Sequence, residues 1–202
     1  AALGRAVRTP AVLTSAAFLF LWNFNPFSSS VQYVYMVRDM GLSDQFYGTM
    51  TSLFAAAAMC GSLAYGFYCR RVPFARLIHL AIVTGVLSTL TYWGLTGKWS
   101  ACLVTVLSGV TYMTGNLIQL DLAARICPPK AAGTVFALLM SVSNLAILTS
   151  TWLGGIWYDQ LDALWGHRAA FNTLVAMGAA FTAGCWLLTP WLRAAGPVDS
   201  ER

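Results

Sequence analysis

The sequence predicts an all-α fold, a polytopic membrane bundle of six transmembrane helices. Of its 202 residues, 58% are hydrophobic and only 9% are charged, whereas a soluble globular domain carries about 25% charged residues. The chain therefore has too few polar side chains to cover a water-facing surface, and we expect lipid to surround it. A membrane β-barrel is excluded, because its strands would be segments of about ten residues with alternating polarity.

Six apolar stretches are long enough to span a bilayer, since a spanning helix needs about 20 apolar residues at a rise of about 1.5 Å each. They predict one six-helix domain over residues 1–202, with helices at residues 10–37, 43–69, 74–96, 99–126, 130–158 and 169–192. Several of these stretches exceed the minimum length, which indicates that the helices tilt or extend beyond the lipid.

Each break between these stretches carries turn or capping residues. In chain order, the breaks lie at residues 39–43, 70–73, 96–98, 127–130 and 159–168. Glycine or proline stands in each of the first four, and the last is rich in charged residues. At the first break, Ser43 and Asp44 are suited to cap the start of the second helix. Because every linker is short, we expect one compact bundle.

The distribution of basic residues predicts the orientation in the membrane. With a cytoplasmic N-terminus, the helix ends on the inside hold Arg5, Arg8, Arg70, Arg71, Arg76, Arg125, Lys130, Arg193 and Arg202. The outside ends hold only Arg38, Lys98 and Arg168. We therefore expect a multi-pass protein of the plasma (inner) membrane, with both termini in the cytoplasm as an even number of spans requires.

Residue types that metal sites and enzymes need are sparse in this chain. The five cysteines lack CxxC spacing, and His79 stands far from His167, so we expect no metal and no cofactor. The spans hold no nucleophile–base pair and no GxxxxGK[ST] motif for ATP, which argues against an enzyme and against a self-contained ATP-driven pump. The basic residues form short clusters and no continuous stripe, which excludes nucleic acid as a partner.

Uncharged polar residues gather at one depth of the predicted bundle. Counted from the cytoplasmic helix ends, Asn23 and Asn25 lie about 20 Å deep, Asn116 about 18 Å and Asn144 about 21 Å. Carboxamides in hydrocarbon need partners, so these side chains should face inward. They form either hydrogen bonds between helices or the lining of a polar cavity, and their shared depth favours the cavity. With Gln32, they are our candidate solute-contacting residues.

The first helix has a sequence that breaks it near this depth. Pro26 follows Asn25 directly and cannot continue the helical hydrogen-bond ladder. Ser28, Ser29, Ser30 and Gln32 come next. A polar, discontinuous helix at mid-membrane is the place where many transporter folds bind their substrate.

Apart from Asp44 at the start of the second helix, Asp121 is the one acidic residue inside a predicted span. A proton-coupled carrier needs a titratable group of this kind within its spans. However, Arg125 follows four residues later on the same helical face, so an ion pair that anchors the helix end is equally consistent with the sequence. Both roles remain open for Asp121 and Arg125 at this point.

Several segments resemble one transporter family. The stretch LAARICPPKAAGTVFALLMSVSN, residues 122–144, resembles the folate-biopterin transporter family of the major facilitator superfamily, at the junction of its tenth and eleventh helices. FLFLWNFNP, residues 18–26, is similar to the seventh helix, and GFYCRRVP, residues 66–73, to the basic loop between the eighth and ninth helices. The resemblance implies helices seven to twelve, half of a twelve-helix major facilitator fold, with an N-terminal six-helix half as partner.

Taken together, the residues and the resemblance predict the C-terminal half of a secondary active transporter. We expect it to move a small polar organic solute, such as a pterin or a folate, by alternating access, with proton coupling through Asp121 as one option. Its expected partners are this solute, the lipid bilayer and the N-terminal half, and the chain is expected to be a segment of a longer polypeptide. The alternative is a membrane scaffold or assembly subunit that does not transport.

Overall fold

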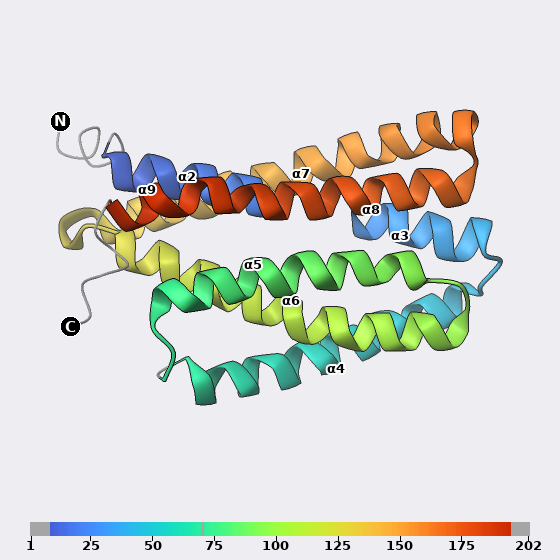
Figure 1. Cartoon of the computed structure of the whole chain (residues 1–202), viewed down its shortest axis with the longest axis horizontal. Coiled ribbons are helices and arrows are strands. Elements are labelled where there is room, and N and C mark those ends of the chain that lie inside the picture. Colours follow the sequence, from blue (N-terminus) through green and yellow to red (C-terminus); the bar gives the residue numbers. More distant parts are fainter. Residues whose placement is uncertain (1–8, 70, 195–202) are drawn as a thin grey trace.

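The computed structural model describes residues 9–69 and 71–194, and the regular structure within them is helical. Figure 1 shows these helices side by side along one long axis, so the predicted all-α bundle is confirmed. Arg5, Arg8, Arg70 and Arg202, which entered the count of basic residues, lie outside the described residues.

Five helical segments are long and apolar enough to cross a membrane. They are α4 (Asp44–Tyr68), α5 (Phe74–Leu90) with the short helix η2 (Thr91–Gly94), α6 (Lys98–Ile126), α7 (Ala132–Trp165) and α8 with its continuation (His167–Leu192). A sixth apolar helix, α2 (Pro10–Asn23), is shorter. The chain is therefore an integral, multi-pass membrane protein.

The first predicted span is divided into three pieces. After α2, the chain is irregular over residues 24–28 and then forms α3 (Ser29–Tyr33) and the π-helical segment η1 (Val34–Asp39). The side chain of Asn25 accepts a hydrogen bond from the backbone N–H of Phe27 at 3.0 Å, which stabilises the irregular segment as an Asx turn. We call residues 24–28 the break.

The other helices begin and end at recognisable signals. Ser43 accepts a hydrogen bond from the backbone N–H of Phe46 at 3.2 Å, which confirms the predicted cap of α4. Helix α7 continues to Trp165, so the loop expected at residues 159–168 is helical over most of its length. No proline or glycine occurs between Tyr158 and Gly166, and that glycine makes the turn into α8 with a φ of 80°.

The helices pack in a fixed order around the bundle. Helix α4 lies along α6, α5 lies between α6 and α8, and α7 contacts both α8 and α2. Helix α8 (His167–Gly184) continues through η4 (Cys185–Leu188) into α9 (Thr189–Ala194), and the short helix η3 (Pro129–Ala131) precedes α7.

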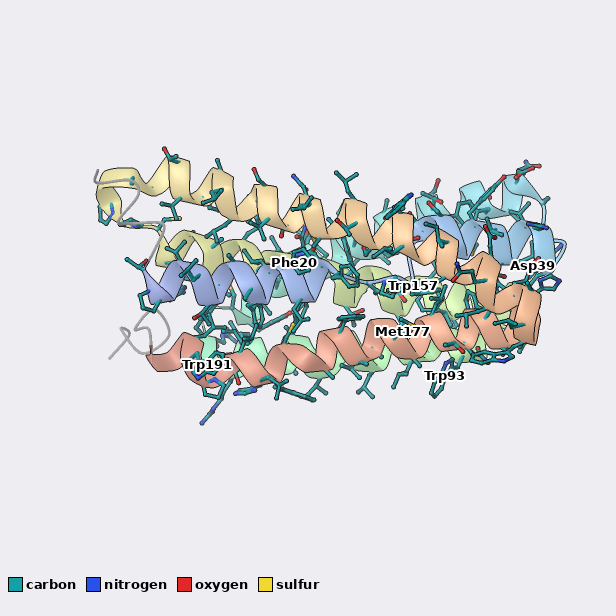
Figure 2. All side chains as sticks on the ribbon, turned by 90° about the horizontal axis from the view of Figure 1, so that it is seen from above. Phe20, Asp39, Trp93, Trp157, Met177 and Trp191 are labelled. Carbon is teal, nitrogen blue, oxygen red and sulfur yellow. The ribbon has the colours of Figure 1, made fainter. Side chains whose placement is uncertain are left out.

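The bundle has two distinct ends. Helix α2 begins and α9 ends at one of them, at the left of Figure 1, which we call the Pro10 end. The turns from η1 to α4, from η2 to α6 and from α7 to α8 lie at the other, which we call the Asp39 end. Figure 2 shows Asp39 and Trp93 at the Asp39 end and Trp191 toward the Pro10 end.

Buried apolar side chains form two separate clusters, one toward each end of the bundle. The Pro10-end cluster is built from α2, α5, α6 and α7 and includes Phe18, Leu19, Ile82, Leu122 and Leu139. The Asp39-end cluster is built from η1, η2, α6 and α8 and includes Tyr35, Met36, Tyr92, Phe171 and Leu174. A layer that contains uncharged polar side chains separates these two clusters.

Polar contacts reinforce the Asp39 end. Asp39, whose side chain is 5% exposed, accepts a hydrogen bond from the hydroxyl of Tyr158 and lies 3.4 Å from Nδ1 of His167. Arg168 donates to the hydroxyl of Tyr35 at 2.9 Å and to backbone carbonyls of the link between η2 and α6. These contacts connect η1, α7, α8 and that link.

Candidate functional site: a polar cavity at the break

A cavity of about 420 Å³ surrounds the break, in the layer between the two apolar clusters. Residues of the divided first span line it together with residues of α4, α5, α6, α7 and α8. All of the described lining residues are uncharged, and most carry a hydroxyl, a carboxamide or an aromatic ring. A few polar groups set in an otherwise apolar concave surface are typical of sites that bind small molecules.

Asn23 joins three helices at the edge of this cavity. Its Nδ2 atom donates to Oε1 of Gln119 on α6 at 2.7 Å and to Oγ of Ser143 on α7 at 2.8 Å. A third acceptor, the carbonyl oxygen of Leu19, also lies at 2.8 Å. An amide nitrogen has two hydrogens, so these three acceptors share them. The network positions the last residue of α2 against α6 and α7.

Three glycines on three helices allow the break to approach the bundle closely. A Cβ atom on Gly154 of α7 would lie 2.1 Å from the carbonyl oxygen of Pro26, and one on Gly178 of α8 would lie 2.1 Å from Oδ1 of Asn25. A Cβ atom on Gly115 of α6 would lie 2.8 Å from the ring of Trp22, immediately before the break. A larger residue at Gly154 would displace the backbone of the break, whereas one at Gly178 or Gly115 would displace the side chain of Asn25 or the ring of Trp22.

Four of the five candidate solute-contacting residues line the cavity: Asn23, Asn25, Gln32 and Asn116. The Nε2 atom of Gln32 lies 3.5 Å from the hydroxyl of Tyr92. The half-buried carboxamide of Asn116 has no hydrogen-bond partner among the described residues, so both its donor and its acceptor are available to a ligand. The structure therefore brings these four residues together.

Asn144 is the exception, because the structure does not bring it into this cavity with the other four. Its side chain is exposed and does not line the cavity. The buried positions of α7 recur every three or four residues, at Leu139, Ser143, Ala146 and Ser150. Successive residues of an α-helix are rotated by about 100°, so Ser143 faces inward while Asn144 does not. Its depth was estimated from the sequence, but depth does not determine which face of a helix a residue occupies.

Gln119 and Ser143 belong to the polar layer, although the sequence analysis did not select them. Gln119 is 6% exposed and lines the cavity, and Ser143 is 8% exposed and bonds to Asn23. Gln119 follows Asn116 by three residues, a spacing that places both on one face of α6. Ser143 could have been identified because it falls on the regular repeat of inward-facing positions along α7. Both signals come from helical periodicity and not from depth.

The candidate coupling residues lie outside the cavity. The Nε atom of Arg125 is 3.1 Å from Oδ1 of Asp121, and both side chains are partly exposed. The guanidinium of Arg125 also lies over the ring of Phe74, 4.5 Å from its centroid. Neither residue is among those that line the cavity. This geometry is the helix-end ion pair that the sequence left open as the alternative to proton coupling.

Carboxamides, hydroxyls and aromatic rings define what the cavity can bind. Each carboxamide offers donors beside an acceptor, and the rings of Trp22, Phe27 and Tyr92 offer flat apolar faces. A flat molecule with hydrogen-bonding groups at its edge matches this lining. Within the described part of the chain, no three His, Cys, Asp or Glu side chains are grouped as metal ligands would be.

Comparisons with known proteins are consistent with this geometry. The BT1 family model matches residues 1–196. The "Folate-biopterin transporter" of Synechocystis sp. is 28% identical over 162 residues, which are 75% of this chain and 33% of that protein. "Probable folate-biopterin transporter 4" of Arabidopsis thaliana is 25% identical over 194 residues, 91% of this chain and 39% of that protein.

A shorter match covers part of a third relative. "Probable folate-biopterin transporter 2" of Arabidopsis thaliana is 41% identical over 68 residues, which are 32% of this chain and 13% of that protein. The names of these relatives are those of transporters and not of enzymes. The chain spans 33% and 39% of the length of the first two relatives. No solved structure matches the chain at a significant level.

Proposed function

The chain belongs to the BT1 family, and on that premise we propose that it is part of a secondary transporter for a pterin-like or folate-like solute. The single observation that carries this proposal is the uncharged polar cavity at the break, which lies at mid-depth in a bundle of membrane-spanning helices. The names of the curated relatives support the choice of solute. Asn23, Asn25, Gln32, Asn116 and Gln119 are the proposed contacts.

The proposed mechanism is alternating access between two six-helix halves, of which this chain is the C-terminal one in a major facilitator fold. Two features support it. The divided first span ends one helix and begins another beside the cavity, as discontinuous helices do in transporters. The start of α2 and the end of α9 also lie at one end of the bundle, as an even number of crossings requires. We expect the isolated chain not to transport, because the pathway needs both halves.

We also propose that the Pro10 end faces the cytoplasm and that the carrier resides in the plasma (inner) membrane. Arg71, Arg76 and Arg125 support this orientation, since they lie toward the Pro10 end, whereas Arg38 and Arg168 lie at the Asp39 end.

For Asp121, the ion pair with Arg125 supports an anchoring role over a role in proton coupling. The pair joins residues one helical turn apart on α6 and does not reach the cavity. Proton coupling of the carrier remains a separate proposal, and the pH dependence of uptake in an Asp121 variant tests it.

The experiment that tests the proposed function compares two identical substitutions, Asn116→Leu and Asn144→Leu, in the intact carrier. Asn116 lines the cavity, whereas Asn144 is exposed on the outside of α7. We expect Asn116→Leu to abolish uptake of biopterin and folate without lowering the amount of carrier in the membrane, and Asn144→Leu to retain uptake. Normal uptake by the Asn116 variant would remove this residue from the site. Failure of the unmodified carrier to take up either compound would favour the scaffold alternative.

A further inference from the structure

Biopterin and folate, the two solutes in the names of the relatives, differ from each other in charge, and the cavity that would receive them has an uncharged lining. Biopterin is an uncharged bicyclic ring with a short hydroxylated side chain, whereas folate adds a glutamate tail whose two carboxylates are ionised at neutral pH. The pterin ring is common to both. Every described residue that lines the cavity is uncharged. A carboxylate placed there would lose its hydration without gaining an ionic partner from this lining, which costs free energy.

We infer that this cavity holds the uncharged pterin ring, and that the charged tail of a folate lies outside it. The inference rests on the proposed function, and it assigns the two parts of one solute to different places. It also means that this chain contributes little to the discrimination between biopterin and folate, because it contacts the part that they share.

The arrangement of hydrogen-bonding groups fits the edge of such a ring. A pterin carries an amino group beside a lactam N–H and carbonyl, so two donors and an acceptor stand in a row along one edge. Asn116 and Gln119 lie three residues apart on one face of α6 and line the cavity together. Oε1 of Gln119 already accepts from Asn23 at 2.7 Å, which orients its Nε2 donor, while Asn116 offers both kinds of group.

Aromatic side chains supply surfaces for the faces of the ring. Trp22 precedes the break and Phe27 belongs to it, and the ring of Tyr92 packs against that of Phe27 with 4.6 Å between their centroids. Proteins that read a flat heterocycle commonly combine edge hydrogen bonds with such aromatic contacts. Trp22 is itself held against Gly115, so its position is fixed before the ligand arrives.

The first test uses the unmodified intact carrier and fragments of folate. Displacement of bound radiolabelled biopterin is measured with 6-hydroxymethylpterin, the uncharged ring alone, and with p-aminobenzoylglutamate, the charged tail alone. We expect the ring fragment to displace biopterin and the tail fragment to have at least a hundredfold weaker effect. Displacement by the tail at concentrations similar to those of the ring would overturn the inference.

The second test places a charge in the cavity by a matched pair of variants, Ile147→Asn and Ile147→Asp. Ile147 lines the cavity and is 44% exposed, so a polar residue is tolerated there. The two replacements have nearly the same shape and differ in charge. We expect the ratio of folate to biopterin dissociation constants to be the same in both variants, within twofold. A tenfold higher ratio in Ile147→Asp would place the tail beside the new carboxylate and overturn the inference.

The two tests separate the inference from the proposed function. A carrier that binds biopterin and folate, but in which the tail fragment competes well, refutes only the assignment of the ring to this cavity. A carrier that binds neither compound refutes the proposed function and the inference with it. If both Ile147 variants fail to fold, the fragment competition on the unmodified carrier still decides the question.

Discussion

The middle of the bundle and its two ends are held together by different kinds of contact. At the ends, apolar side chains from several helices fill two clusters with members such as Leu122 and Phe171, both 0% exposed. In the middle, the helices meet through carboxamides, hydroxyls and backbone groups that lie against glycines. Apolar packing depends on volume and tolerates exchanges of similar size. In the middle layer, the contacts between helices depend on the positions of individual atoms.

This difference separates stability from function within one fold. Removing methyl groups from an end cluster leaves a void and lowers the free energy of unfolding, but it leaves the groups around the cavity in place. Adding a single methyl group at Gly154 in the middle displaces the break, to which Asn25 and Pro26 belong. The following changes test this contrast, from the largest expected effect to the smallest.

Among these changes, Gly154→Ala should have the largest effect on solute affinity. Its Cβ atom would lie 2.1 Å from the carbonyl oxygen of Pro26, so the break must move away from α7. We expect solute affinity to fall by at least about tenfold, equivalent to about 1.4 kcal/mol. The measurement is the dissociation constant of biopterin in the purified carrier.

Gly155→Ala is the matched control for this prediction. A Cβ atom at Gly155 would meet nothing within 4 Å, so we expect unchanged affinity. Equal affinities of the two variants would show that the break does not need its close contact with α7.

Leu122→Ala should affect stability but not affinity. Leu122 is fully buried in the Pro10-end cluster, and such truncations cost about 2–5 kcal/mol. We expect a lower Tm in detergent and an unchanged dissociation constant for the fraction that remains folded. Leu120→Ala, at a position that is 36% exposed on the same helix, serves as the control with little change in Tm. A loss of affinity in Leu122→Ala without a loss of stability would contradict the claim that the end clusters determine stability and the middle layer determines binding.

Asp121→Asn should have the smallest effect. It removes a partly exposed ion pair between residues one helical turn apart, and such pairs contribute about 0.3–0.5 kcal/mol. We expect a nearly unchanged Tm and the same dependence of uptake on external pH as in the unmodified carrier. Loss of that pH dependence would instead assign Asp121 to proton coupling.

Much of the fold was predictable from the sequence because its signals are local. Long apolar runs predicted membrane-spanning helices, and Pro26 after Asn25 predicted the discontinuity of the first one. The prediction failed where charge was taken as a sign of a loop. The charged segment after Tyr158 continues α7 up to Trp165, since charged side chains at a helix end are solvated without unwinding it.

The sequence predicted how deep each site residue lies in the bundle, but not which face of its helix the residue occupies. Counting residues along each helix brought Asn23, Asn25 and Asn116 to one level, and these three line the cavity. The same count included Asn144, which lies on the exposed face of α7. The contacts of the three glycines with the break could not be inferred at all, because they depend on how α6, α7 and α8 pack around it.

The most direct measurement of the central claim is protection of the cavity by its solute. In an intact carrier from which all native cysteines, including the five of this chain, have been removed, a cysteine is introduced either at Thr151, which lines the cavity, or at Ser141, which is exposed on the same helix. At a biopterin concentration of about ten times its Kd, occupancy slows a reaction at the occupied site by about tenfold.

We predict that biopterin slows the alkylation of Thr151→Cys by this factor and leaves that of Ser141→Cys unchanged. Equal alkylation rates of Thr151→Cys with and without biopterin, in a carrier that takes biopterin up, would show that the solute does not bind at the break.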